Sequence, residues 1–256
     1  MWSRPCLFDG RSFYKMEASI LSVTKLNKHF GGLSAICDLS FDVQAGEALG
    51  LMGPNGAGKS TLLNIIAGEY KPSSGAIYYK KYDITALAPH KICHLGIART
   101  YQIPQPFINL TALQNIAVAA EYGRGFGKAA AEMEASKILD IVDLSEKEDV
   151  FARDLAAITL KRLELARALA TNPTLLLLDE VAAGLTEEEI PRILEILQRV
   201  REMGITYILV EHVMRVMTKA VGKIIVVDKG VKIAEGSPNE VMEDRKVIEA
   251  YLGEAV

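Results

Sequence analysis

One glycine-rich segment, Gly53 to Thr61, constrains the fold of this chain more than any other feature. It matches the pattern G-x-x-x-x-G-K-[ST] and reads Gly53-Pro54-Asn55-Gly56-Ala57-Gly58-Lys59-Ser60-Thr61. An apolar segment suited to a strand, Glu47 to Met52, comes before it, and apolar residues at helical spacing follow it. A strand, a glycine-rich loop and a helix in this order predict an α/β fold with a phosphate-binding loop at one edge of a sheet.

The residue types within this loop suit the binding of a nucleotide. Glycines allow successive N–H groups to point inward, and the following helix adds the positive end of its dipole. Lys59 supplies a fixed positive charge, Ser60 offers its hydroxyl to Mg²⁺, and Thr61 supports the phosphates from the next position. We therefore predict that the segment binds ATP together with Mg²⁺. The alternative, a glycine-rich turn without function, does not account for the flanking strand and helix.

Two adjacent carboxylates are predicted to face this loop. Asp179 and Glu180 follow the apolar segment Leu175 to Leu178, so both should emerge at the carboxyl edge of the sheet, where ligands bind in open α/β folds. Asp179 is expected to hold Mg²⁺, directly or through water. Glu180 is expected to polarise or orient the attacking water. The alternative is that the two acids only end a buried strand.

Composition excludes several other classes of protein. The chain has 256 residues and a net charge of −3, so it lacks the basic footprint of a nucleic-acid binder. Its three cysteines are odd in number and show no C-x-x-C spacing, which argues against a disulfide framework or a zinc site. No apolar run reaches the roughly 20 residues that a transmembrane helix needs. The first residues lack the apolar core of a signal peptide, and Met16 is an alternative start.

The order of further residues resembles that of the nucleotide-binding subunits of ABC transporters, over nearly all of Ile20 to Gly253. Gln102 is similar to the glutamine that senses Mg²⁺ and water in that family. His212 is similar to the histidine that contacts the γ-phosphate, and Phe30 to the aromatic residue that stacks on adenine. The alternatives are a solvated loop amide, a structural histidine and a core aromatic residue, respectively.

The chain divides into β-rich and helical segments. Short strands are expected at 20–26, 39–43, 47–52 and 75–79, alanine-rich helices at 113–121 and 128–142, and strand–helix alternation after Pro173. The resemblance implies a P-loop (RecA-like) nucleotide-binding core with an antiparallel β subdomain and an inserted α-helical subdomain. The expected boundaries are an extension at 1–17 and one ATPase domain at 18–253, in which 18–88 and 168–253 form the core and β subdomain and 89–167 the helical subdomain.

One motif departs from the family pattern. The signature usually written L-S-G-G-Q aligns with Leu155-Ala156-Ala157-Ile158-Thr159. In that family the serine hydroxyl and the glycine amides contact the γ-phosphate bound by a partner's loop. Ala156 has no hydroxyl, and β-branched Ile158 replaces a glycine. Thr159 is expected to cap the following helix. We therefore expect this chain to pair with a second, non-identical ATPase subunit that carries an intact signature.

Three sequence segments are most similar to the ATPases of branched-chain amino acid importers: 96–102, 161–167 and 250–254. Similar segments occur in ATPases for urea or amide import and for lipopolysaccharide export. The resemblance implies membrane permease subunits as partners, a periplasmic or extracellular binding protein as an indirect partner, and a peripheral location at the cytoplasmic face of the membrane. A soluble ABC ATPase acting on nucleic acid or ribosomes is the alternative of a different class; the long coiled coils, zinc modules or second cassette of such proteins are not visible in the sequence.

Overall fold

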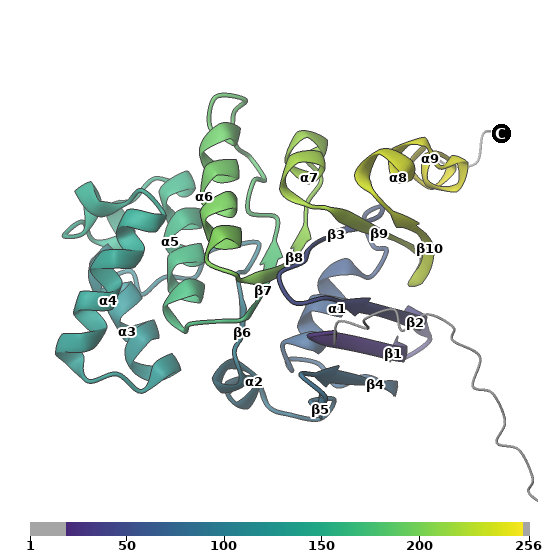
Figure 1. The fold of residues 1–256 in the computed structure, drawn as a ribbon, viewed down its shortest axis with the longest axis horizontal. Coiled ribbons are helices and arrows are strands. Elements are labelled where there is room, and N and C mark those ends of the chain that lie inside the picture. Colours follow the sequence, from purple (N-terminus) through teal and green to yellow (C-terminus); the bar gives the residue numbers. More distant parts are fainter. Residues whose placement is uncertain (1–18, 253–256) are drawn as a thin grey trace, which may run out of the picture.

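Two β-sheets with helices packed around them make up the chain (Figure 1). The computed structural model describes residues 19–252, so the extension predicted at 1–17 lies outside the described residues. The smaller sheet is antiparallel with the strand order β2-β1-β4-β5. Its strands are β1 (Leu21–Phe30), β2 (Leu33–Val43), β4 (Ser74–Tyr79) and β5 (Tyr82–Asp83). This is the antiparallel β subdomain that was expected.

The larger sheet has the order β10-β9-β3-β8-β7-β6, and all its neighbours pair in parallel except β9 and β10. Its strands are β3 (Ala48–Met52), β6 (Ile97–Arg99), β7 (Leu175–Asp179), β8 (Thr206–Val210), β9 (Lys223–Asp228) and β10 (Val231–Gly236). Leu51 and Asp179 both lie opposite Val210 in the register. The segments that follow β3, β7 and β8 therefore leave the sheet at the same edge.

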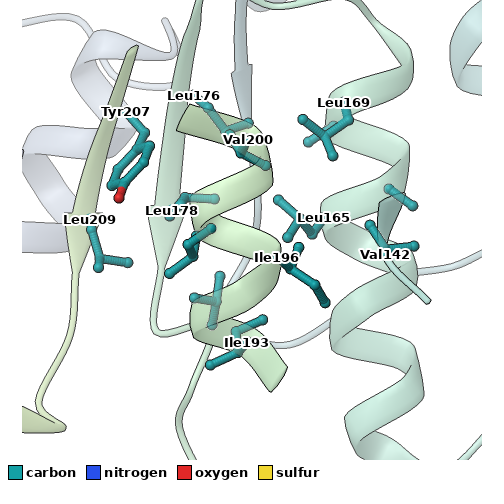
Figure 2. Close-up of a cluster of buried hydrophobic side chains, with 14 of the residues drawn as sticks. Val142, Leu165, Leu169, Leu176, Leu178, Ile193, Ile196, Val200, Tyr207 and Leu209 are labelled. Atoms are coloured by element: carbon teal, nitrogen blue, oxygen red, sulfur yellow. The ribbon is translucent and has the colours of Figure 1, made fainter. Parts of the chain in front are cut away.

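Both faces of this sheet are buried, which explains why its strands are apolar throughout. Successive side chains of β7 alternate between two hydrophobic clusters, Leu176 and Leu178 in one, Leu175 and Leu177 in the other. Figure 2 shows the first cluster, where side chains of β7 and β8 meet those of α5 and α6. The second cluster joins the larger sheet to α1 and to the antiparallel sheet.

The helices follow the predicted segments closely near the phosphate-binding loop. The helix expected directly after the phosphate-binding loop is α1 (Lys59–Ile66), and Gly68 after it has a φ of 79°, typical of a helix C-terminus. One of the helices expected after Pro173 is α6 (Ile190–Glu202), with Pro191 in its first turn. The other helices are α2 (Pro89–Leu95), α3 (Ala112–Arg124), α4 (Lys128–Ile141), α5 (Ala157–Ala170), α7 (Met214–Ala220), α8 (Pro238–Glu243) and α9 (Arg245–Leu252).

A helical layer of α3, α4 and α5 stands beside the β6 edge of the larger sheet (Figure 1). The segment predicted as helical, 89–167, needs one correction, because it also contains β6. Ile97 of β6 pairs with Leu175 of β7, so this strand belongs to the core sheet. A strand of three residues is too short to show an alternating pattern, which is why the sequence did not reveal it.

From Val231 onward, the sequence placed the chain in the core but predicted no individual strand or helix. This C-terminal part comprises β10, α8 and α9, and α9 packs against α8 and β10. A signal for α8 was present, since Ser237 and Glu240 form a capping box at its start. Among residues 19–252, no helix is both long enough and apolar enough to span a membrane.

Candidate functional site

A cavity of about 470 Å³ lies at the edge where β3, β7 and β8 end. Its lining brings together four of the predicted groups: the phosphate-binding loop, Gln102, Glu180 and His212. Phe30 lines the same cavity from the end of β1. Residues separated by more than a hundred positions in the sequence therefore surround one space, which is large enough for a small-molecule ligand.

The shape of the phosphate-binding loop depends on Gly58, because no residue with a side chain fits at this position. Gly58 immediately precedes α1 and has a φ of 104°, and a Cβ there would lie 2.4 Å from the carbonyl oxygen of Ala35 on β2. Lys59 follows, and its ammonium donates to the carbonyl oxygens of Gly53 at 2.7 Å and Pro54 at 2.9 Å. Burial lowers the pKa of Lys59, and the nearby Glu180 carboxylate opposes that shift.

Side chains from three segments hold Glu180. The amide of Gln102 donates to Oε2 at 2.8 Å, and Nε2 of His212 lies 3.3 Å from Oε1. The backbone of Glu180 is left-handed, with a φ of 53°. The ammonium of Lys161 on α5 bonds the Glu180 carbonyl oxygen at 3.0 Å. The left-handed conformation of Glu180 costs a non-glycine residue roughly 1–2 kcal/mol. Such strain is commonly found where it orients a functional group.

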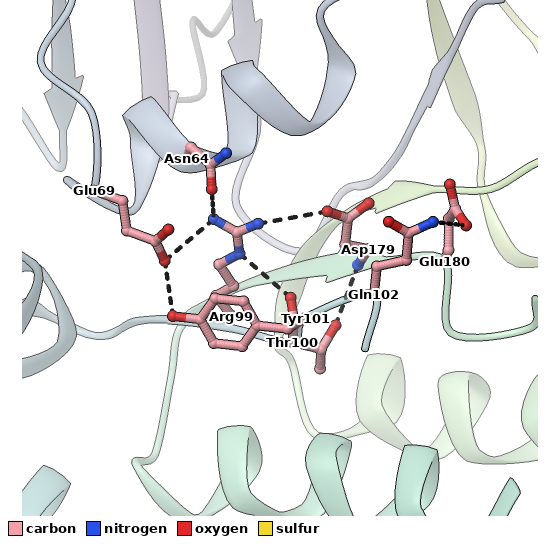
Figure 3. Close-up of polar contacts among 8 residues, drawn as sticks. All are labelled: Asn64, Glu69, Arg99, Thr100, Tyr101, Gln102, Asp179 and Glu180. Carbon is pink, nitrogen blue, oxygen red and sulfur yellow. Dashed lines mark hydrogen bonds and ion pairs between the residues drawn. The ribbon is translucent and has the colours of Figure 1, made fainter. Parts of the chain in front are cut away.

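Arg99 at the end of β6 joins the carboxylate of Asp179 to the loop after α1 (Figure 3). Its guanidinium lies 3.4 Å from Oδ2 of Asp179 and 3.3 Å from Oε1 of Glu69, and it donates to the Asn64 side chain. Tyr101 packs against the guanidinium at 4.7 Å from its ring centroid and donates its own hydroxyl hydrogen to Glu69 at 2.7 Å. Burial, followed by contact with Glu69, raises the pKa of Tyr101 to about 12.

Asp179 has one oxygen engaged and one free. Its side chain is only 3% exposed, and among residues 19–252 the buried Oδ1 atom has no hydrogen-bond partner. Burial raises the pKa of this carboxyl, while Arg99 opposes the shift and keeps a positive charge beside it. Ser60 lies close enough to lower the same pKa. A buried, unpartnered carboxylate oxygen beside a hydroxyl suits an oxygen-seeking cation such as Mg²⁺.

Glu211 connects the loops that follow β7 and β8. It is 1% exposed, and its carboxylate accepts the backbone N–H of Ala182 at 2.6 Å and of His212 at 3.2 Å. Burial raises the pKa of Glu211, and these backbone donors oppose the shift. The carboxylate thus ties the His212 segment to the residues that follow Glu180.

Sequence reasoning missed Arg99, Lys161 and Glu211. Arg99 lies three residues before Gln102, and Glu211 directly precedes His212; each is a charged residue at the end of a short apolar strand. That position was a usable signal, because charged residues are rarely buried without a partner. Lys161 lies one turn into α5, and nothing in its sequence neighbourhood distinguishes it from a solvated lysine.

Phe30 lies at the rim of the cavity. Its ring meets Tyr70 edge to face with centroids 5.5 Å apart, and the Lys28 ammonium lies 4.7 Å from its centroid. With 42% of its surface exposed, Phe30 is not a core residue. Its stacking on adenine remains a prediction.

The signature-like segment Leu155–Thr159 forms the start of α5. Ala156 is the N-cap residue and is exposed, and no side chain caps the helix. The prediction that Thr159 caps α5 is wrong: it lies within the first turn and is 3% exposed, because the helix begins at Ala157. Within the described residues, the lining of the 470 Å³ cavity contains none of this segment.

Two family profiles match the chain. Residues 36–183 match the profile described as "ABC transporter", and residues 231–256 match the one described as "Branched-chain amino acid ATP-binding cassette transporter". The first covers more than half of the chain, and the second includes β10, α8 and α9.

Curated relatives and solved structures agree with these matches. A probable branched-chain amino acid transport ATP-binding protein LivG of Archaeoglobus fulgidus is 36% identical and covers 91% of this chain and 95% of its own. The high-affinity branched-chain amino acid transport ATP-binding protein BraF of Pseudomonas aeruginosa is 35% identical over 94% of this chain and 100% of its own. The ADP conformation of MJ1267, an ATP-binding cassette of an ABC transporter, superposes with a TM-score of 0.83 at 33% identity, covering 93% of this chain and 100% of that chain.

Proposed function

Because this chain belongs to the ABC transporter family of ATP-binding proteins, we propose that it is the ATPase subunit of an importer for branched-chain amino acids. The observation that carries the ATPase role is the cavity where the phosphate-binding loop, Gln102, Glu180 and His212 meet. The substrate class rests on the C-terminal profile match and on the names of the relatives.

In the proposed mechanism the loop residues bind the phosphates of ATP. N–H groups at the start of α1 and the Lys59 ammonium face the negative charge, and Phe30 stacks on the adenine. Mg²⁺ would be held by Asp179 and Ser60, where it would offset the charge of the phosphate oxygens. Glu180 accepts a hydrogen bond from Gln102 and lies beside His212. These contacts support the proposal that its carboxylate orients a water for attack on the terminal phosphate.

The signature-like segment supports a further part of the proposal, pairing with a non-identical ATPase. Ala156 and Ile158 would be the residues presented to a partner's nucleotide, and neither offers a hydroxyl or a glycine amide. One composite site in such a pair would use this chain's loop and an intact partner signature. The other would use the partner's loop and the aliphatic segment, and would be the weaker site.

Permease subunits are the proposed membrane partners, with this chain bound peripherally at the cytoplasmic face. ATP-driven closure of the two ATPases would move the permease, and hydrolysis would reset it. A substrate-binding protein outside the membrane would act on the permease without touching this chain.

Affinity purification from the native membrane tests this assignment. A tagged chain should co-purify with permease subunits and with a second ATPase, and the reconstituted complex should take up leucine in an ATP-dependent manner. A matched complex with Lys59→Ala should assemble but not transport. Recovery of a permease that transports urea or lipopolysaccharide instead would contradict the substrate class and leave the ATPase role intact.

The pairing has its own test. The purified chain alone should hydrolyse ATP far more slowly than a mixture with the co-purified second ATPase. If the chain alone forms an ATP-dependent homodimer that turns over as fast as the mixture, the pairing proposal fails.

A further inference from the structure

We propose that Tyr251 on α9 is a positioning residue for the phosphate-binding loop, which it holds by accepting a hydrogen bond from the first glycine of that loop. The backbone N–H of Gly53 donates to the Tyr251 hydroxyl oxygen at 2.8 Å. The contact joins residues 198 positions apart in the chain. It makes the C-terminal helix part of the nucleotide site without placing it against the nucleotide.

Gly53 is the point where β3 turns into the loop, and it has almost no freedom of its own. Its φ is 150°, and a Cβ there would lie 2.0 Å from the carbonyl oxygen of Val227 on β9. Since no side chain can fit, this buried residue is held through its backbone. Its N–H bonds Tyr251 and its carbonyl oxygen accepts the Lys59 ammonium at 2.7 Å. The residue that Tyr251 fixes is therefore the one that anchors the loop lysine.

The middle of the loop borders a second cavity. This cavity, of about 510 Å³, is lined by residues 54–57, by residues at the β9–β10 turn and on β10, and by α9. Asn55, Gly56 and Ala57 line both cavities. Loop residues that border open space depend more on their fixed contacts. Two of these contacts are the Gly53–Tyr251 bond and a bond from the Gly230 N–H to the Ala57 carbonyl oxygen at 3.0 Å.

Packing of α9 determines where the Tyr251 hydroxyl lies. Val247, one turn earlier, is 3% exposed and belongs to the large hydrophobic cluster. Residues four apart lie on the same helix face, so the buried Val247 fixes the orientation of the face that carries Tyr251, which itself remains 42% exposed. Burial also raises the pKa of Tyr251, and the hydrogen bond from Gly53 opposes that shift. A shift of α9 would therefore withdraw the acceptor from Gly53.

The decisive variant is Tyr251→Phe, which keeps the ring and removes only the hydroxyl. It leaves the buried Gly53 N–H without its acceptor. We expect ATP and ADP, each with Mg²⁺, to bind about 3- to 10-fold more weakly, as loss of one hydrogen bond predicts. The maximal turnover at saturating ATP should change much less, because Tyr251 does not touch the groups around Glu180. Amide hydrogen exchange should become faster in the peptide that contains Gly53.

The full-length chain serves for these measurements, with Tyr82→Phe as the control. Tyr82 is 70% exposed on the antiparallel sheet, so its variant should match the unaltered protein in every readout. A merely structural tyrosine would lower the melting temperature without weakening nucleotide binding well below that temperature. Unchanged nucleotide affinity together with unchanged exchange at Gly53 in Tyr251→Phe would overturn the proposal.

A second variant, Tyr251→Ala, separates the hydroxyl from the ring. If the hydroxyl positions the loop, Tyr251→Phe should account for most of the affinity lost in Tyr251→Ala. If only Tyr251→Ala weakens nucleotide binding, the ring's packing is responsible and the hydrogen bond is not, which also overturns the proposal. Neither result depends on which amino acid is transported or on the identity of the second ATPase.

Discussion

The phosphate-binding loop and the signature-like segment Leu155–Thr159 both lead into a helix, but their first residues differ in kind. Before α1 stands Gly58 with a φ of 104°, where only glycine fits against Ala35. Before α5 stands Ala156 in an extended conformation, with no side chain to bond the free N–H groups of the first turn. One helix start is shaped for a ligand that approaches its backbone, and the other presents methyl groups.

In the proposed pairing, the two regions belong to different composite sites, and their local structures differ in kind. Around the loop, polar groups from four segments converge and satisfy one another, as in the bonds of Glu180 with Gln102 and His212. At the start of α5, Ala156 and Ala157 are exposed and Ile158 is half-buried. We therefore expect substitutions near the phosphate-binding loop to change the rate of ATP hydrolysis. Substitutions at Ala156 should mainly change the stability of α5.

The largest effect is expected from Glu180→Gln, which keeps the shape of the side chain and removes its charge. Turnover should fall by about 100-fold or more, the range expected for loss of a general base, while ATP binding stays intact. Steady-state hydrolysis and nucleotide titration measure the two quantities. Glu188→Gln, at an exposed position eight residues later, should be unaffected. Unchanged turnover in Glu180→Gln would remove Glu180 from the proposed mechanism.

A smaller effect is expected at Glu211, whose two oxygens accept backbone N–H groups from both loops. In Glu211→Gln one donor would face an amide NH₂ group, so the free energy of unfolding should fall by about 1–3 kcal/mol. Turnover should fall as well, because His212 loses its anchor. Urea unfolding and ATPase assays measure these changes, and the exposed Glu243→Gln is the matched control. Equal stability of the two variants would contradict the role given to the buried carboxylate.

Lys161 links the two compared regions, since it lies on α5 and bonds the carbonyl oxygens of Glu180 and Ala183. Lys161→Met should lower turnover by about 10-fold through loss of a charge-assisted hydrogen bond to the Glu180 backbone, with ATP affinity little changed. A parallel assay of Lys128→Met, exposed at the start of α4, gives the control. A loss of ATP affinity with normal turnover would show that Lys161 acts on the loop instead.

The smallest effect is expected from Ala156→Ser, which restores a side chain able to cap α5. The serine oxygen can accept an N–H of the first turn, so the chain should become about 1 kcal/mol more stable. Chemical unfolding measures the gain, against Ala130→Ser in the exposed face of α4, where a serine should be neutral or slightly destabilising. If Ala156→Ser destabilises the chain, the N–H groups in the first turn of α5 already have partners. The two helix starts would then differ less than we propose.

Much of the site was predictable because its motifs are local. The loop from Gly53 to Thr61, the acids after β7 and the histidine after β8 each follow a short apolar strand, and parallel strands place such ends at one edge. Gln102 and Phe30 were assigned through resemblance, and both line the cavity. Strand β6 escaped prediction because three residues carry too little pattern, and the segment from Val231 onward because its α8 capping box was overlooked.

By itself the sequence determined the phosphate-binding loop, its lysine and the order of the acidic and histidine segments, because these depend on residue types at fixed short spacing. Only the tertiary structure decided which groups support them. Arg99 meets Asp179, Glu211 spans two loops, and Tyr251 reaches Gly53 across 198 positions. Such contacts arise from strand order and helix packing, which bring residues that are distant in sequence within hydrogen-bonding distance. No local sequence pattern indicates them.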